Sequence, residues 1–290
     1  MDLIYRFDPF RPIAIDRPAD AKAAIRVLLE GNQRLVDFID RMQRATVHGS
    51  AGPEQTIVPV DLLSMGLPFF PGAALDQAPF ALVLGCSDAR VPIESIFDQS
   101  FNDLFVVRIA GNVLGTECMG SFDYAVRSLS GGLKAVVVLG HTACGAVTAA
   151  VDTYLNPNDY ADIAFTHALR SLIDRMLVSV RGAAHSFERH CGHEIHCHPG
   201  FRAALIEASV YLNSAITAFD LQREIASAGG ISSLAVFYGV CDISDMLVRS
   251  DPAIGQAFDP QLRPAPTSTD NFMGLADHLA RVISAGELLK

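Results

Sequence analysis

The stretch Phe80-Ala-Leu-Val-Leu-Gly-Cys86-Ser-Asp88-Ala-Arg90 joins a continuous apolar run to a group of chemically active side chains. A second stretch, Ala135-Val-Val-Val-Leu-Gly-His141-Thr-Ala-Cys144, has the same arrangement. Apolar runs of this length are typical of parallel strands buried on both faces. Because ligands of such sheets sit at the carboxyl ends of the strands, we expect two thiols and one imidazole to meet there.

The rest of the chain predicts the fold around these two strands. Apolar runs alternate with helical patterns, which indicates βαβ crossovers. We expect an α/β fold with a mostly parallel central sheet, helices on both faces, an N-terminal helical arm and an inserted helix and loop segment. The expected strands are 80–85, 104–108, 135–140 and 233–240, and the expected helices are 20–41, 119–130, 145–154, 161–181, 202–227 and 272–285.

Two regions are expected along the chain. Residues 1–76 form an N-terminal region with an irregular arm over 1–18, the first helix and a Gly- and Pro-rich loop over 45–76. Loops this long are usually functional or interfacial. Residues 77–290 form the catalytic α/β domain, with the insertion at 156–200.

Composition excludes several classes of protein. The net charge of −10 argues against a nucleic-acid partner, since duplex binding needs a clustered basic face. The sequence contains no apolar stretch of about 18 residues that could span a membrane. Six cysteines in 290 residues do not make a disulfide framework, and the N-terminus does not read as a secretion signal. We therefore expect a cytoplasmic protein with reduced thiols.

The two motifs predict a catalytic metal site. Thiolate and imidazole are preferred zinc ligands, and the set Cys86, His141 and Cys144 leaves a fourth position open. Asp88 is placed to accept a hydrogen bond beside the metal, and Arg90 can hold it through a bidentate pair. The alternative interpretation is two buried cysteines and a core histidine.

A second group of metal-ligand residues lies in the insertion, within the segment 190–198. Tracts of this composition can bind metal, although the spacing fits no zinc finger. The alternatives are a capped loop with solvated side chains and a proton relay. The candidates for a second metal site are His190, Cys191, His193, His196, Cys197 and His198.

The segments Cys86-Ser-Asp-Ala-Arg-Val91 and His141-Thr-Ala-Cys-Gly-Ala146 resemble the zinc-site motifs of the β-class carbonic anhydrases. The similarity runs through 77–152, is partial over 20–44 and 202–249, and is absent from 45–75 and 156–200. The chain departs from the family at Ala89, where Ser is common, and at Cys241, where Tyr is frequent.

The resemblance implies a zinc lyase that reversibly hydrates carbon dioxide to bicarbonate and a proton by means of zinc-bound hydroxide. One zinc per chain would be held by Cys86, His141 and Cys144. Asp88 and Arg90 would be the catalytic dyad.

The resemblance also implies substrate-binding roles for Gln77 and Gly145. Gln77 would act across a subunit boundary of a homodimer or a multiple of dimers, whose N-terminal helices embrace the partner. One alternative is a carbon disulfide or carbonyl sulfide hydrolase on the same scaffold, reached differently because of the 45–75 and 156–200 segments. The other is a non-catalytic zinc- or bicarbonate-binding protein, against which the dyad argues.

Overall fold

The computed structural model describes residues 2–8, 17–48, 55–60, 72, 76–227, 234–252 and 260–289. Its main sheet confirms the expected mostly parallel α/β fold. The parallel strands lie in the order β4-β3-β5-β6. They are β3 (Ala81–Gly85), β4 (Leu104–Arg108), β5 (Ala135–His141) and β6 (Ala235–Cys241). The short strands β7 (Val248–Arg249) and β8 (Arg263–Pro264) pair antiparallel with β6.

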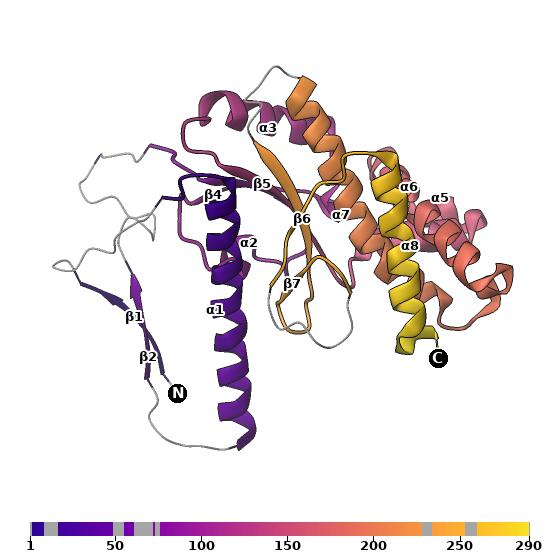
Figure 1. Cartoon of the computed structure of the whole chain (residues 1–290), viewed down its shortest axis with the longest axis horizontal. Coiled ribbons are helices and arrows are strands. Elements are labelled where there is room, and N and C mark those ends of the chain that lie inside the picture. Colours follow the sequence, from indigo (N-terminus) through magenta and orange to yellow (C-terminus); the bar gives the residue numbers. More distant parts are fainter. Residues whose placement is uncertain are drawn as a thin grey trace.

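Helices cover both faces of this sheet, as expected (Figure 1). On one face, Leu82 and Leu84 of β3 join the core beneath the larger group of helices. That group comprises α3 (Thr116–Ser128), α4 (Gly145–Leu155), α6 (His167–Cys191), α7 (Phe201–Ser227) and α8 (Thr269–Ala285). On the other face, Ala81 and Val83 pack beneath α1 (Ala21–His48) and α2 (Ile93–Ile96). Burial on both faces explains why β3, and β5 up to Gly140, are apolar at every position.

The N-terminal region differs from its expectation in two places. Strand β1 (Asp2–Phe7) pairs in parallel with β2 (Gln55–Val60), although both segments were predicted to be irregular. The Pro and Gly residues around β2 favour a loop and outweigh its short β-branched run Thr-Ile-Val. The pairing with β1 joins segments far apart in the sequence, so local composition does not reveal it. Pro59 is tolerated because β2 is an edge strand.

Helix α1 is longer than expected and has two different halves. In the first half, Ala24, Ile25 and Leu28 are buried against the sheet. The second half runs on to His48, beyond the predicted end at residue 41, and projects away from the sheet (Figure 1). There Met42 and Val47 are 40% and 77% exposed. The second half of α1 therefore exposes apolar side chains that the described part of the chain leaves uncovered.

The insertion is more helical than expected. The single helix predicted over 161–181 is instead the short α5 (Tyr160–Ile163) followed by α6, which continues to Cys191. Thr166 starts α6 by accepting a hydrogen bond from the backbone N–H of Leu169. A 3-10 helix, η3 (His193–Cys197), joins α6 to the segment before α7.

The structure also contains three shorter 3-10 helices among its described residues: η1 (Ala110–Asn112), η2 (Pro157–Asp159) and η4 (Glu287–Leu289). Within the described residues, no helix combines the length and the apolar character needed to cross a bilayer.

Candidate metal centre

Three metal-ligand side chains meet where β3 and β5 end. Cys86 follows β3, His141 is the last residue of β5, and Cys144 is the N-cap of α4. Because β3 and β5 are neighbours in the sheet, their loops leave the same edge side by side. The two sulfurs lie 4.0 Å apart, and both lie within 4.8 Å of a His141 ring nitrogen. All three residues are buried, at 4%, 0% and 1% exposure.

The donor set fits a zinc ion. Two thiolates on a tetrahedral zinc lie about 3.8 Å apart, given Zn–S bonds of about 2.3 Å, and the observed 4.0 Å is close to this. His141 Nδ1 donates to the Thr142 carbonyl at 2.9 Å, so Nε2 is left as the lone-pair nitrogen. Among the described residues, the buried Nε2 has no hydrogen-bond partner. A metal ion would satisfy this nitrogen.

The two thiols influence each other strongly. The hydrogen bond from the Cys144 thiol, aided by that from the Gly111 N–H, lowers the pKa of Cys86. The same sulfur–sulfur hydrogen bond, together with burial, raises the pKa of Cys144. Of the two thiols, Cys86 therefore ionises more readily. A bound cation would take the place of the thiol protons.

Asp88 and Arg90 form a fixed ion pair beside the cluster. Arg90 Nε and one terminal nitrogen donate to the two Asp88 carboxylate oxygens at 3.0 Å and 2.7 Å, and the Arg90 backbone N–H adds a third bond of 2.9 Å. The Arg90 side-chain hydrogen bonds hold the pKa of Asp88 well below its usual range. One Asp88 oxygen lies 3.9 Å from His141 Nε2. Asp88 is thus an ionised acceptor held next to the ligand atoms.

Arg90 also connects the two motifs. Its terminal nitrogen donates to the carbonyl of Ala143 at 3.2 Å, so one side chain bridges the loop after β3 and the loop after β5. Ala143 has a positive φ of 52°, which costs energy for a residue with a side chain. The bridge helps to hold this turn, and it was not foreseen from the sequence.

Sequence reasoning missed a further set of supporting residues. Arg108, at the end of β4, donates to the carbonyls of Cys86 (2.9 Å) and Asp88. Asn213 of α7 donates to the carbonyl of Gly111 at 2.7 Å, and the Gly111 N–H donates to the Cys86 sulfur at 3.3 Å. The position of Arg108 at the carboxyl end of a neighbouring strand was a usable signal. Asn213 has no local signal, since it lies on a distant helix.

Gly111 has a steric reason to be glycine. Its φ is +68°, and a Cβ at this position would lie 2.5 Å from the sulfur of buried Met176 on α6. The insertion therefore packs directly behind the residue that donates to Cys86. This contact gives the insertion a structural link to the metal centre.

The end of β6 supports the histidine loop from the other side. The Thr142 N–H donates to the Cys241 carbonyl at 3.0 Å, and the Ile243 N–H donates to the Thr142 hydroxyl at 3.1 Å. Cys241 is fully buried in the core on the α1 side, and burial raises the pKa of its thiol to about 12. Cys241 is therefore a packing residue.

The two predicted substrate-binding residues lie apart from each other. Gly145 is exposed at the first residue of α4, next to Cys144. Gln77 is exposed before β3, at the amino end of the strand, whereas Cys86 follows its carboxyl end. The length of β3, at about 3.3 Å per residue, separates Gln77 from Cys86, His141 and Cys144 of its own chain.

The His- and Cys-rich segment is brought together only in part. His193 and His196 lie within 4.8 Å of a carboxylate oxygen of Glu188, measured between ligand atoms. Glu188 was missed from the sequence because it lies on α6, before the tract begins. The Cys191 sulfur contacts the Ser284 hydroxyl at 3.1 Å, and His198 Nδ1 accepts the Gly200 N–H at 3.1 Å.

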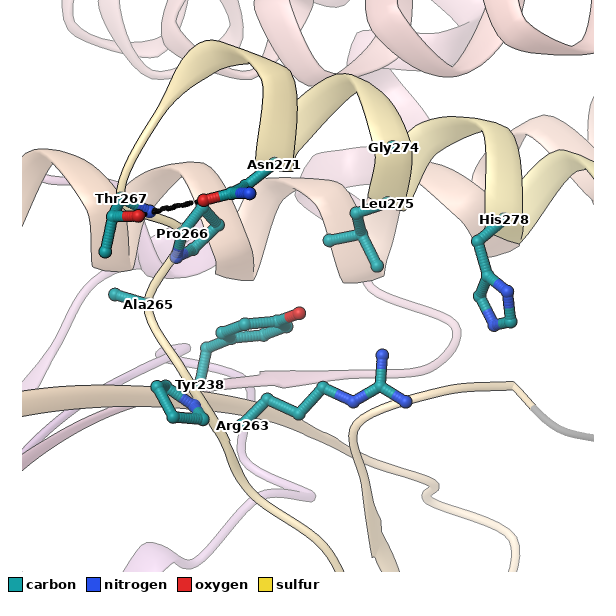
Figure 2. A pocket seen from close by; sticks show the side chains of 10 residues that line it. Tyr238, Arg263, Ala265, Pro266, Thr267, Asn271, Gly274, Leu275 and His278 are labelled. Carbon is teal, nitrogen blue, oxygen red and sulfur yellow. Dashed lines mark hydrogen bonds between the residues drawn. The ribbon is translucent and has the colours of Figure 1, made fainter.

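A pocket of about 410 Å³ lies elsewhere, between the β8 segment and α8 (Figure 2). Tyr238, Arg263 and His278 point toward its centre, and none of the predicted site residues lines it. Asp251 pairs with both Arg263 (3.5 Å) and His278. Asp251, which follows β7, thus already engages both side chains and links them to the end of the sheet.

Comparisons with known proteins point to one family. A family model described as carbonic anhydrase matches residues 81–227. The chain is 40% identical over 129 residues to carbonic anhydrase 2 of Mycobacterium tuberculosis, covering 44% of this chain and 52% of that protein. It is 41% identical over 110 residues to a carbonic anhydrase of Mycolicibacterium smegmatis, covering 37% and 50%. The chain thus spans about half the length of these relatives.

Solved structures give a more distant similarity. The β-carbonic anhydrase of Coccomyxa in complex with acetazolamide is 21% identical, with a TM-score of 0.45 over 77% of this chain and 83% of that one. The β-carbonic anhydrase CcaA is 23% identical, with a TM-score of 0.48 over 66% and 81%. Since the family match covers 147 of 290 residues and includes Cys86, His141 and Cys144, this chain belongs to the β-carbonic anhydrase family.

Proposed function

We propose that this protein is a zinc-dependent lyase that catalyses the reversible hydration of carbon dioxide to bicarbonate and a proton. The main support is one arrangement: three buried zinc-type donors converge next to a carboxylate that an arginine holds with two hydrogen bonds. A site that only stored metal would have no need of this ion pair. Membership of the family supports the same reaction.

Cys86, His141 and Cys144 would hold one zinc ion per chain. Bound zinc supplies Lewis-acid chemistry, by lowering the pKa of water so that hydroxide is available near neutral pH. The chain's own contribution begins with burial. The three donors are almost inaccessible, and electrostatic interactions in such a site are stronger than in water.

Asp88 orients the nucleophile. Because Arg90 holds its pKa low, Asp88 is ionised at neutral pH and can only accept a hydrogen bond. An O–H group between Asp88 and His141 would donate to this carboxylate and turn its lone pair toward the incoming carbon atom. Arg90 keeps both Asp88 oxygens engaged and so restrains the carboxylate from replacing the nucleophile at the metal.

The substrate side of the site is proposed to need a second copy of the chain. Gln77 lies at the opposite end of β3 from Cys86, so it can reach a metal centre only in another subunit. The projecting half of α1 carries Met42 and Val47 as exposed apolar residues that a partner subunit would cover. We therefore propose a homodimer or a multiple of dimers, with Gly145 offering a backbone N–H beside Cys144. Light scattering after gel filtration measures the assembly, and a monomer would overturn it.

We also propose that the protein works in the cytoplasm. All six cysteines are free, and persistent disulfides are rare in that compartment. Fractionation of cells that produce the protein tests this location.

Stopped-flow measurement of carbon dioxide hydration by the zinc-loaded protein tests the proposed reaction. We expect saturable hydration that follows the zinc content. Absence of hydration from neutral to alkaline pH, with zinc bound, would overturn the proposal. Parallel assays with carbonyl sulfide and carbon disulfide separate the remaining cases: turnover of either one alone would indicate a hydrolase, and no turnover at all a metal-binding protein.

A further inference from the structure

The corner between α6 and α7 carries a second group of metal-ligand atoms on the surface. His193 Nδ1 hydrogen-bonds to a Glu188 carboxylate oxygen at 2.6 Å, and the rings of His193 and His196 lie 5.2 Å apart. One ligand atom from each of the three residues lies within 4.8 Å of the others. Such spacing suits three donors around a single cation. None of these residues takes part in the proposed reaction.

The backbone explains how the three residues come together. Helix α6 ends at Cys191, and Gly192 adopts φ 85°, a conformation that favours glycine and turns the chain back. The following 3-10 helix places residues three apart on the same side, so His193 and His196 share one face. Glu188 lies in the last turn of α6, beneath that face. The Gly192 N–H donates to the Glu188 carbonyl at 2.9 Å and closes the turn.

The core holds this corner in place. Ile195, between the two histidines, is buried and joins the main core. The His196 ring packs edge-on against Phe201 with centroids 4.9 Å apart, and Phe201 packs in the same way on Phe187 at 5.9 Å. The contact with Phe201 therefore holds the His196 ring in position. Donors held in this way lose less conformational entropy when an ion binds.

The local charges favour a cation. The carboxyl end of a long helix carries a partial negative charge, and Glu188 adds a carboxylate to the end of α6. The neighbouring Arg189 is paired with Asp277 of α8, which compensates its charge. His193 is 84% exposed at its side chain and Glu188 40%, so an ion can enter directly from solvent.

The structure also reduces the number of candidate metal ligands in the segment 190–198. Cys191 contacts Ser284, and His198 accepts the Gly200 N–H. His190 and Cys197 do not belong to the group of converging donors found among the described residues. The group has two imidazoles and one carboxylate, and no thiolate.

We propose that Glu188, His193 and His196 bind a second metal ion, a divalent first-row transition metal such as Zn²⁺, Ni²⁺ or Cu²⁺. Imidazole and carboxylate donors suit these ions, and water completes the coordination at this open surface. The ion joins the last turn of α6 to η3 and so strengthens the corner that leads into α7. It is separate from the buried centre in both donors and position.

Titration calorimetry with Ni²⁺ on zinc-loaded protein tests the site. Nickel is not redox-active with the exposed cysteines, and zinc analysis alongside checks that the buried ion is retained. We expect about one Ni²⁺ per chain. His193→Ala, His196→Ala and Glu188→Gln should each weaken binding at least about tenfold, the lower range for changes in a metal's outer shell. His196→Phe keeps the ring against Phe201 and removes only the donor, so it separates ligation from packing.

Two matched controls come from the same tract. His190→Ala and the pair Cys191→Ser with Cys197→Ser should leave the Ni²⁺ affinity unchanged. The proposal is overturned if zinc-loaded protein binds no Ni²⁺, if His196→Phe binds it normally, or if either control loses it. Carbon dioxide hydration should be the same for His196→Phe and the wild type, so this test fails or succeeds independently of the proposed reaction.

Discussion

The buried cluster of Cys86, His141 and Cys144 and the exposed cluster of Glu188, His193 and His196 are each built from three donors, yet the chain makes them in opposite ways. The buried cluster draws on two strands that are adjacent only in the folded sheet. The exposed cluster comes from one continuous stretch of helix, turn and 3-10 helix. The donors of one site come from distant parts of the sequence, and those of the other lie within nine consecutive residues.

The difference in surroundings decides what each site can do. The buried donors are at most 4% exposed. The Gly111 N–H of η1 donates to the Cys86 sulfur, and the Ile243 N–H, just after β6, donates to Thr142 beside His141. Low dielectric and excluded water strengthen every interaction there, and this suits the activation of a nucleophile. The exposed donors compete with bulk water. We expect their ion to bind weakly, exchange readily and contribute to local order only.

Replacing one ligand in each cluster gives the largest contrast. Cys144→Ala should lose zinc and lower hydration by more than the roughly 10–100-fold typical of outer-shell changes, because a first ligand is removed. His196→Phe should leave the buried zinc and hydration unchanged. Metal analysis and stopped-flow assays on both variants measure this contrast. Zinc retained at full occupancy by Cys144→Ala would contradict the ligand assignment.

Asp88→Asn asks whether the buried site is more than a metal holder. We expect zinc to remain, and hydration to fall by about 10²–10⁴-fold, the range for a positioned acid or base. The surface pair of Asp98 and Arg34, joined at 2.6 Å, offers a control, since Asp98→Asn should change neither property. Loss of zinc together with activity in Asp88→Asn would instead make Asp88 part of the metal-binding framework.

Asn213→Ala tests whether distant support matters for the buried cluster. Without the 2.7 Å bond to its carbonyl, Gly111 should hold its N–H less firmly toward the Cys86 sulfur. We expect zinc affinity to fall about 10–100-fold and the free energy of unfolding by about 1–3 kcal/mol. Thr217→Val, a buried position one turn further along α7, is the control. Reduced stability with unchanged zinc affinity would assign Asn213 a purely structural role.

Glu207→Gln probes the carboxyl group of a partly buried residue of α7, and its effect is confined to stability at neutral pH and above. Burial, with Asp242 nearby, raises the pKa of Glu207 from 4.5 to about 7. The folded state therefore binds a proton that the unfolded state has lost, and stability falls as pH rises from about 4.5 to about 7. Above that range the glutamine variant should be more stable than the wild type, by at most about 3 kcal/mol.

Urea unfolding at several pH values measures this difference. The exposed Glu94→Gln is the control and should follow the wild type throughout. A Glu207→Gln curve parallel to the wild type between acidic and neutral pH would contradict the raised pKa.

The sequence by itself determined the central strands, the helices that follow them and the identity of the buried donors. It could do so because residues in strands buried on both faces must be apolar, and because polar motifs directly after them can lie only at the carboxyl edge. Both signals are local, so they can be recognised without knowing the partner strands. The Pro- and Gly-rich residues around β2 were misleading because local composition does not show that β2 pairs with the distant β1.

Tertiary structure decided the supporting residues and which donors of the second cluster converge. Asn213 and Met176 contact Gly111, beside the Cys86 sulfur, from distant helices, and a hydrogen bond or close packing of this kind leaves no trace in local spacing. Glu188 joined the exposed histidines only because Gly192 turns the chain back over the end of α6. Composition shows which donors a chain has, but convergence depends on dihedral angles and packing, and these exist only in the fold.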